Sequence, residues 1–391
     1  MSLKIGLFND SFPPTIDGVA NTVLNYAEIL HKNHGDVTVA TPKYPHVKDD
    51  YPFEVYRYSS VPVIGPFTYR IGNPVSPIII SELRARKLDL VHIHSPFVSS
   101  LLARAVTAGR KKNRIPVILT YHTKYDVDIA KFVHNKRIQK AIIKFLLFNI
   151  KHADEVWTVS EGAGESLRKI GYKGEYKVMF NGTDFEKGKA DDTVIDEIKR
   201  VYALKGDELV FLFVGRMMWY KNIKLIIDTL KILDEKGLKF RALFVGDGND
   251  RPAIEHYANE QGLESKAIFA GAIYNREKMR GYYSIADLFL FPSTYDTSGL
   301  VVKEAAACSC ASLLIDGSCA AEGVVHDETG LLCEETPEAC AQTVYDAATA
   351  EGKLKQLGKN ASKQVYVSWE DAIAKAYSRY EEILKTWPYR R

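Results

Sequence analysis

Several features that would point to particular classes of protein are absent from this sequence. No apolar run approaches the roughly 18 to 20 residues that a membrane-spanning helix needs. Residues 4–10 are typical of a strand that runs into polar residues, not of a signal peptide. The formal net charge is only +3, too small to indicate nucleic acid from the chain as a whole. Any partner recognised by charge must therefore be sought in local clusters.

Cysteine is scarce as well. The five cysteines lie late in the chain, are odd in number and lack the paired C-x-x-C spacing of zinc sites. They are Cys308, Cys310, Cys319, Cys333 and Cys340. We expect reduced, mostly buried thiols in a cytosolic protein.

The composition is that of a folded protein. Hydrophobic residues make up 46% and charged residues 26% of the chain, which excludes a disordered or fibrous protein. At 391 residues the chain is too long for one average core, so we expect two domains.

Short apolar runs alternate with amphipathic segments along the chain. In the first half, strands are predicted at residues 4–8, 37–40, 88–93, 116–121 and 155–159. In the second half, strands are predicted at residues 209–215, 240–246, 266–270, 287–291 and 311–315. Helical patterns such as 19–31 and 99–110 lie between strands. This alternation predicts βαβ units and two parallel sheets.

The boundary between the domains is predicted near residue 182. Residues 181–190 carry turn residues and charges but few apolar side chains, as connectors do. We therefore expect Rossmann-like domains at 1–181 and 182–368, and a C-terminal amphipathic helix within 369–391 that either caps a domain or crosses back to the first. Doubly wound sheets bind ligands beyond the carboxyl ends of their strands, so two facing sheets would form a cleft.

The loop after the first predicted strand carries one glycine, Gly18, where a helix is expected to begin. Exposed N–H groups at a helix start favour a phosphate, although an ordinary strand-to-helix turn has the same pattern. The G-x-G-x-x-G pattern of nicotinamide enzymes is absent here, which disfavours a dehydrogenase.

Two cations follow the first predicted strand of the second half. Arg216 stands at the strand end, and Lys221 comes five residues later at the start of a predicted helix. This placement suits a diphosphate, but two solvated surface charges would show the same spacing.

Residues 291–304 join another strand end to another helix. Asp296 and Glu304 stand eight positions apart around Gly299. Asp296 is expected in the loop and Glu304 one to two turns into the helix. A capping carboxylate and a helix-surface carboxylate are the alternative interpretations.

Three histidines lie at predicted strand ends. His122 would project into the cleft, although a structural histidine is the more common case. His92 and His94 would share one face of a strand, but no third metal ligand is evident nearby. Residues 126–128 match the D-x-D of metal-dependent transferases, which is too short a match to predict a metal. We expect no metal site.

Residues 131–151 contain no acidic side chain. Wound as a helix, they place four lysines along one stripe: Lys136, Lys140, Lys144 and Lys151. Four apolar side chains fall largely opposite: Ile138, Ile142, Phe145 and Leu146. Such a helix would rest on anionic lipid, each exposed lysine adding roughly 1 kcal/mol near the surface. A core helix with a solvated basic face is the alternative.

Taken together, these segments resemble the retaining glycosyltransferases of family GT4 over nearly the whole chain. Four motifs occur in the same order and on the same elements. The resemblance implies an α/β fold of the GT-B type, in which two Rossmann-like parallel-sheet domains face an interdomain cleft. The N-terminal domain would then face the acceptor, and the C-terminal domain would bind a nucleotide sugar.

The resemblance also implies roles for the donor-binding residues. In that family the glycine loop lies under the donor phosphates, which implies Gly18. The cations that grip the diphosphate correspond to Arg216 and Lys221, and the carboxylate on the ribose hydroxyls corresponds to Glu304. Base contacts in this fold are largely through the backbone, which implies a position near Ile273.

The remaining positions lie by the reacting centre. The carboxylate that contacts the transferred sugar corresponds to Asp296, and the histidine of the first domain corresponds to His122. Asp296 stands where the family usually has glutamate, which shortens the carboxylate by about 1.5 Å. The usual Phe-Gly is replaced by Ser298-Gly299. The resemblance implies that the donor-binding turn comprises Ser298, Gly299, Leu300 and Val301, and that the amides of the last two residues would add phosphate contacts.

The implied activity is that of a hexosyltransferase (EC 2.4.1 class) that works by same-face substitution. Its cations would stabilise the charge that grows on the leaving diphosphate, so no metal or other cofactor is required. Residues 92–97 and 120–125 look most like the bacterial 1,2-diacylglycerol 3-alpha-glucosyltransferases, which make membrane glycolipids from UDP-glucose. This likeness implies a lipid acceptor such as diacylglycerol, no nucleic acid, and a cytoplasmic protein bound peripherally to the inner face of the cell membrane.

Two alternatives stay open. A soluble transferase of the same family that acts on a sugar, polysaccharide or protein would share every donor motif. A non-transferring sugar-nucleotide epimerase or binding protein on the same fold is suggested by Asp296 and by the altered stretch at residues 309–311.

Overall fold

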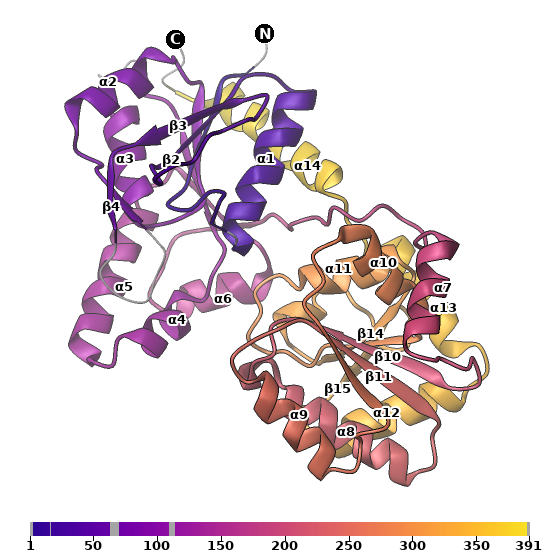
Figure 1. The fold of residues 1–391 in the computed structure, drawn as a ribbon. Helices are drawn as coiled ribbons and strands as arrows, with labels where there is room; N and C mark the ends of the chain where they lie inside the picture. The colour runs from indigo at the N-terminus through magenta and orange to yellow at the C-terminus, as the bar shows by residue number, and fades with distance from the viewer. Residues whose placement is uncertain (1–2, 16, 63–69, 109–113, 389–391) are drawn as a thin grey trace. The chain divides into compact units, whose positions relative to one another are not determined.

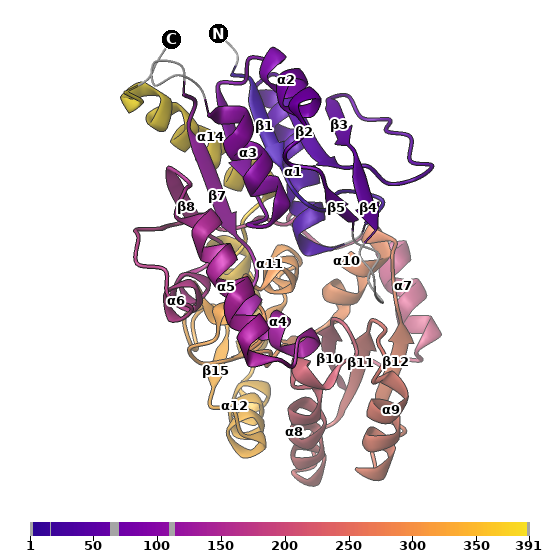
Figure 2. The ribbon, with the colours of Figure 1, turned by 90° about the vertical axis from the view of Figure 1, so that its left-hand side faces the viewer.

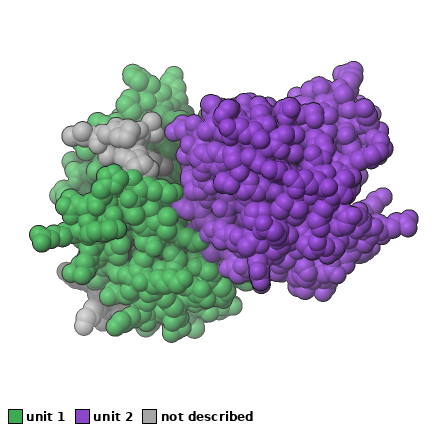
Figure 3. All heavy atoms as spheres, turned by 90° about the horizontal axis from the view of Figure 1, so that it is seen from below, with its two compact units in different colours: residues 1–181, 369–391 green, residues 182–368 purple. Residues whose placement is uncertain are grey.

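The structure is a computed structural model that describes residues 3–15, 17–62, 70–108 and 114–388. The chain divides into two compact units, coloured green and purple in Figure 3. Unit 1 comprises residues 1–181 and 369–391, and unit 2 comprises residues 182–368. Each unit has its own sheet and its own hydrophobic core.

Unit 1 is built on a seven-stranded parallel sheet in the order β3-β2-β1-β6-β7-β8-β9. Its strands are β1 (Ile5–Phe8), β2 (Val37–Pro42), β3 (Glu54–Tyr58), β6 (Leu90–Ile93), β7 (Val117–Tyr121), β8 (Glu155–Thr158) and β9 (Lys177–Val178). Four of these strands, β1, β2, β6 and β7, are buried along their whole length, as in a sheet covered on both faces. The predicted first parallel sheet is confirmed.

Helices cover both faces of this sheet (Figures 1 and 2). They are α1 (Gly18–Asn33), α2 (Pro77–Ala85), α3 (Val98–Thr107), α4 (Tyr125–Phe132), α5 (Lys136–Ile150), α6 (Glu161–Lys169) and α14 (Trp369–Thr386). A short hairpin pairs β4 (Ser60–Pro62) with β5 (Arg70–Gly72). α2 packs against α3 on one face, and α1 packs against α14 on the other. The C-terminal helix therefore returns to unit 1.

Unit 2 carries a six-stranded parallel sheet in the order β12-β11-β10-β13-β14-β15. Its strands are β10 (Leu209–Val214), β11 (Phe240–Val245), β12 (Ala267–Gly271), β13 (Leu288–Leu290), β14 (Ala311–Ile315) and β15 (Leu331–Cys333). Its α-helices are α7 (Asp192–Val201), α8 (Ile223–Glu235), α9 (Arg251–Glu260), α10 (Arg276–Ile285), α11 (Leu300–Ala307), α12 (Pro337–Thr349) and α13 (Lys353–Gln364). The predicted second parallel sheet is confirmed too.

In both sheets the chain begins near the middle and then builds outward in two directions. The order reverses between β1 and β6 in unit 1, and between β10 and β13 in unit 2. Loops at the carboxyl ends of such a pair diverge to opposite faces and leave a crevice, where doubly wound sheets bind ligands. The topology therefore directs attention to the residues that follow these four strands.

The five cysteines are buried and form no disulfide, as expected. No helix in the described ranges combines the length and the apolar character that crossing a bilayer demands.

Candidate functional site

In unit 2, predicted site residues meet at the carboxyl ends of β10 and β13. The Lys221 ammonium donates to both carboxylate oxygens of Asp296, at 2.7 and 2.8 Å. The Ser293 hydroxyl donates to the same carboxylate at 2.5 Å. Lys221 is only 7% exposed, so it is not a solvated surface charge. The shorter carboxylate at position 296 is thus fixed by a lysine and a hydroxyl.

Aromatic rings surround this ion pair. The Lys221 ammonium lies 5.6 to 5.9 Å from three ring centroids, those of Tyr220, Phe291 and Tyr295. The Arg216 guanidinium lies 5.9 Å from the Tyr220 ring, and its side chain is exposed. The two cations therefore approach one ring from the same loop region, with Arg216 free to reach a ligand.

The turn before α11 leaves the start of that helix open. Gly299 precedes the helix with φ 54° and ψ 43°, a left-handed conformation. A Cβ at this position would lie 2.9 Å from the Ala320 Cα, so glycine is required there. No side chain of the described residues caps the helix. The amides of Leu300 and Val301, next to Ser298, are thus available to an anion.

Glu304 lies one turn into α11, as predicted, and its carboxylate is held by two side chains. It accepts from Arg276 at 2.8 Å and from the Tyr283 hydroxyl at 3.0 Å. Arg276 also donates to Asp184 at 2.8 Å. Burial raises the pKa of Glu304 more than the charge of Arg276 lowers it. Burial lowers the pKa of Arg276, but the carboxylates of Glu304 and Asp184 raise it by more, so the pKa of Arg276 is raised overall.

Arg276, Tyr283 and Asp184 were not found from the sequence. Arg276 is 92 positions from Asp184 and 28 from Glu304, and no local spacing links them. The one local signal is Asn275, whose side chain caps α10 and so fixes the start of the helix that carries Arg276. Ile273 lies half-buried just beyond β12, at the same edge of the sheet.

In unit 1, Gly18 begins α1, where a Cβ would meet no atom within 4 Å. The Asp17 carboxylate caps this helix and accepts from the amides of Val19 and Ala20 at 2.9 and 2.7 Å. Because a carboxylate already takes two amides, the start of α1 is less available to an anion than the start of α11.

The three histidines form one buried cluster at the carboxyl ends of β6 and β7. The rings of His92 and His94 lie 4.0 Å apart, which confirms that they share a face. His94 Nδ1 lies 3.0 Å from His122 Nε2. His92 contacts the hydroxyls of Thr120 at 2.7 Å and Tyr380 at 2.6 Å. His94 therefore orients His122, and Tyr380 ties α14 to the cluster.

Burial lowers the pKa of His122 to about 3. Burial and the neighbouring imidazoles lower the pKa values of His92 and His94 well below the ordinary range. All three rings are thus neutral at physiological pH, and each has one donor and one acceptor nitrogen.

The basic helix differs from its sequence-based description in two ways. It begins at Lys136 instead of 131, because α4 ends at Phe132 and Asn135 caps the new helix. The apolar face was expected opposite the lysines, but Ile138 and Phe145 are 50% and 38% exposed. The buried face is formed by Leu146, Asn149 and Ile150, because those positions meet the neighbouring elements.

The four predicted lysines, Lys136, Lys140, Lys144 and Lys151, are all exposed. Across the described residues, none of them forms an ion pair with a carboxylate. Phe148 is a further apolar side chain on this helix, 48% exposed. The outward half of α5 thus carries both unpaired cations and exposed apolar groups.

Comparisons with known proteins match both units. The family model described as Glycosyltransferase Family 4 matches residues 16–187, and the model described as Glycosyl transferases group 1 matches residues 194–364. The fold and these matches define a hexosyltransferase with the GT-B fold. The chain belongs to glycosyltransferase family 4.

Individual relatives differ in what their names describe. An alpha-monoglucosyldiacylglycerol synthase from Acholeplasma laidlawii is 27% identical, over 78% of this chain and 79% of that protein. A GDP-mannose-dependent alpha-mannosyltransferase from Corynebacterium glutamicum is 25% identical, over 95% of this chain and 90% of that protein. Among solved structures, Anabaena HepE in complex with UDP-glucose superposes with a TM-score of 0.71 at 17% identity, covering 98% of this chain and 99% of that one.

Proposed function

We propose that the protein is a retaining glucosyltransferase that moves glucose from UDP-glucose to a lipid acceptor, such as diacylglycerol, at an anionic membrane surface. The observation that carries the choice of acceptor is the outward half of α5, with its four unpaired lysines and its exposed apolar side chains. The family alone does not separate this acceptor from a soluble one.

The donor is proposed to lie at the carboxyl edge of the unit 2 sheet. Its diphosphate would contact Arg216, Lys221 and the open amides at the start of α11, which offer two cations and a helix N-terminus to one anion. Its ribose hydroxyls would donate to Glu304, whose carboxylate is already oriented by Arg276 and Tyr283. UDP-glucose in the HepE structure supports this class of donor.

The proposed reaction is same-face substitution at the sugar carbon. The bond from the sugar carbon to the diphosphate oxygen breaks as the oxygen of the acceptor hydroxyl bonds to the same carbon, and the hydroxyl proton passes to the departing phosphate. Arg216 and Lys221 stabilise the negative charge that grows on this phosphate. Asp296 contacts the sugar and shares Lys221 with the diphosphate. A neutral His122 hydrogen-bonds a hydroxyl near the reacting carbon. The cations supply the charge neutralisation, so the proposed mechanism needs no metal or other cofactor.

The acceptor proposal follows from the chemistry of α5. Exposed lysines attract anionic headgroups, and exposed phenylalanine and isoleucine side chains enter the boundary between headgroups and acyl chains. The Acholeplasma relative, named for a glucosyldiacylglycerol product, supports the same class of acceptor. We infer a cytoplasmic protein that binds peripherally to the inner face of the membrane.

A second candidate is favoured by the Corynebacterium relative, whose name specifies GDP-mannose. A transferase that uses this donor, or that acts on a soluble sugar, polysaccharide or protein, would have the same motifs. A non-transferring epimerase or binding protein would have the fold and the donor site without an acceptor.

Two measurements separate these functions. In sedimentation with vesicles of phosphatidylcholine, phosphatidylglycerol and diacylglycerol, a lipid transferase sediments and a soluble one stays in the supernatant. In the same samples, a transferase releases UDP from UDP-glucose only when diacylglycerol is present. Release of UDP with no dependence on diacylglycerol, or no sedimentation, would contradict the lipid acceptor.

A further inference from the structure

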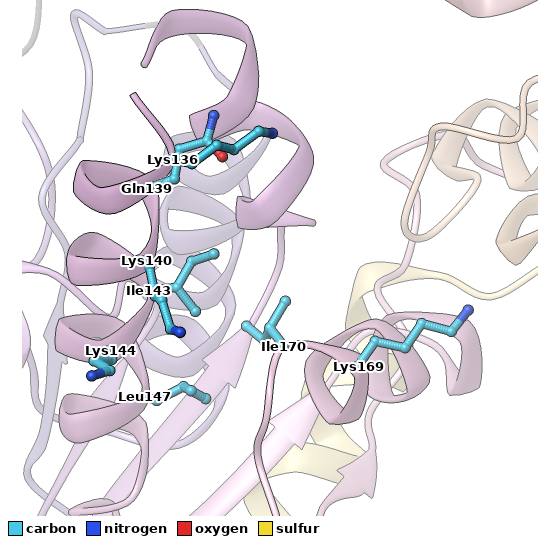
Figure 4. Close-up of a pocket in the computed structure, with 8 residues that line it drawn as sticks. All are labelled: Lys136, Gln139, Lys140, Ile143, Lys144, Leu147, Lys169 and Ile170. Carbon is cyan, nitrogen blue, oxygen red and sulfur yellow. The ribbon is translucent and has the colours of Figure 1, made fainter. Parts of the chain in front are cut away.

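A pocket of about 500 Å³ opens between α5 and the end of α6 (Figure 4). Lysines, one amide and three aliphatic side chains line it: Lys136, Lys140, Lys144, Lys169, Gln139, Ile143, Leu147 and Ile170. The lining contains no acidic residue. In this pocket the basic stripe of α5 therefore borders a hollow of ligand size.

The cations of this pocket come mainly from successive turns of α5. Lys136, Lys140 and Lys144 are four residues apart, which sets them about 6 Å apart along the helix axis. Their stems are long enough for neighbouring ammonium groups to reach one phosphate. Figure 4 shows Lys140 on the side of α5 that faces Ile170, whereas the Lys169 ammonium points away from α5. Lys140 is therefore the central cation.

The aliphatic part of the lining limits which anion fits. Ile143, Leu147 and Ile170 present only carbon to the cavity. Free phosphate has no carbon with which to shield these side chains from water, whereas the carbon atoms of the glycerol in a phosphodiester would cover them. The exposed apolar side chains Phe145 and Phe148 stand on the same helix, where they would lie at acyl-chain level beside such a headgroup.

We infer that this pocket binds the phosphodiester headgroup of an anionic glycerophospholipid, with Lys140 and its neighbours on α5 as the phosphate ligands. This inference rests on the proposed function, in which α5 lies on a membrane. It goes beyond that function because it assigns a discrete site to one class of lipid, where the lysine stripe alone would give only a diffuse attraction to any negative surface.

The test compares two lysines of the stripe, one inside the pocket and one outside. Lys140 lines the pocket, whereas Lys151, at the end of α5, does not. Both are exposed, so Lys140→Gln and Lys151→Gln remove the same charge without disturbing the core. Binding is measured to phosphatidylcholine vesicles that contain phosphatidylglycerol, and to vesicles given the same surface charge by oleate.

We expect the wild type to bind the phosphatidylglycerol vesicles about 5-fold more tightly than the oleate vesicles, a difference worth roughly one lysine contact. Lys140→Gln loses this preference. Lys151→Gln weakens binding to both kinds of vesicle equally and keeps the preference. If the two variants behave alike, the attraction is diffuse and the pocket is not a headgroup site.

A soluble ligand is tested in the same assay. Glycerol 1-phosphate carries the phosphate and the glycerol of the headgroup in soluble form. At about 10 mM it should weaken binding of the wild type to phosphatidylglycerol vesicles and leave binding of Lys140→Gln unchanged. Equal displacement of the wild type and Lys140→Gln, or displacement of the wild type from both kinds of vesicle alike, would show a diffuse attraction and overturn the inference.

Transfer to diacylglycerol in vesicles of phosphatidylcholine alone separates the two proposals. If glucose is transferred but the protein binds phosphatidylglycerol and oleate vesicles equally well, the headgroup site is refuted and the proposed function stays intact. A preference that depends on Lys140 without any transfer supports the headgroup site and removes diacylglycerol as the acceptor.

Discussion

From the ion pair between Lys221 and Asp296 we predict that one substitution, Asp296→Asn, has opposite effects on donor binding and on catalysis. In the free protein both carboxylate oxygens of Asp296 accept from Lys221. If Lys221 grips the diphosphate, this carboxylate competes with it for the same cation and repels it. Asp296→Asn should therefore strengthen binding of UDP while it slows transfer, because the sugar loses its carboxylate contact.

The magnitude follows from the geometry. Opposite charges about 4 Å apart interact by about 4 kcal/mol at an effective dielectric constant of about 20. The Asp296 side chain is 25% exposed, so solvent screens part of this energy. We expect a gain of about 1 to 2 kcal/mol, or about 5- to 30-fold in the dissociation constant of UDP. kcat should fall by about 100-fold or more, as when one group that stabilises the transition state is lost.

Isothermal titration with UDP and initial-rate kinetics measure the two effects. Asp234→Asn is the matched control, since Asp234 pairs with Lys266 just before β12, at the amino edge of the same sheet. This control should change neither quantity. Unchanged or weaker binding of UDP to Asp296→Asn would refute the idea that Lys221 is shared between the carboxylate and the diphosphate.

Other predictions concern the donor site and the histidine cluster. Lys221→Ala and Glu304→Ala should each lower kcat/KM by about 100-fold or more while the protein stays folded. Wild-type turnover in either variant would refute the site. The buried histidines of unit 1 have lowered pKa values, so their contribution to stability is complete above the ordinary pKa of about 6.5 and is lost as the pH falls below it. Because three protons would be taken up on unfolding, the free energy of unfolding should fall by about 4 kcal/mol for the pH unit from pH 6 to pH 5. Urea unfolding at several pH values should show a slope about one third smaller for His94→Asn than for the exposed-site control His256→Gln; equal slopes would show that His94 is not buried as a neutral ring.

The strands could be predicted from the sequence because a parallel sheet covered on both faces needs apolar side chains on both. The run 209–214 is an example, since nearly all of it is buried. The edge strand β3 was missed because most of its residues are half-buried or exposed, so it has no apolar run. β9 is only two residues long, too short for any pattern to mark.

The site could be predicted in part, for a similar reason. Loops after strands are placed by the topology, so Arg216, Lys221 and Asp296 could be assigned to one edge of a sheet. That Lys221 and Asp296 form an ion pair could not be predicted, because the pair depends on how two loops 75 positions apart pack. The link from Arg276 to Glu304 depends in the same way on the contact between two helices.

The basic helix shows the limit of helical periodicity. Periodicity gives the angle between the lysine stripe and the apolar positions, but not which side the rest of the protein covers. In the structure α5 buries a face between the two, so Ile138 and Phe145 remain exposed. Neighbouring elements decide this, for example through Asn149, which donates to the Pro96 carbonyl at 2.8 Å.

The central claim is that this chain glucosylates a membrane lipid. Its most direct test is to incubate the protein with UDP-glucose labelled in the sugar and with vesicles of diacylglycerol, phosphatidylcholine and phosphatidylglycerol, and then to extract the lipids. The account predicts labelled glucolipid in the organic phase with an α linkage, formed in equal amount with UDP and absent when GDP-mannose replaces the donor. Binding of UDP-glucose with no labelled lipid, or a β-linked product, would contradict it.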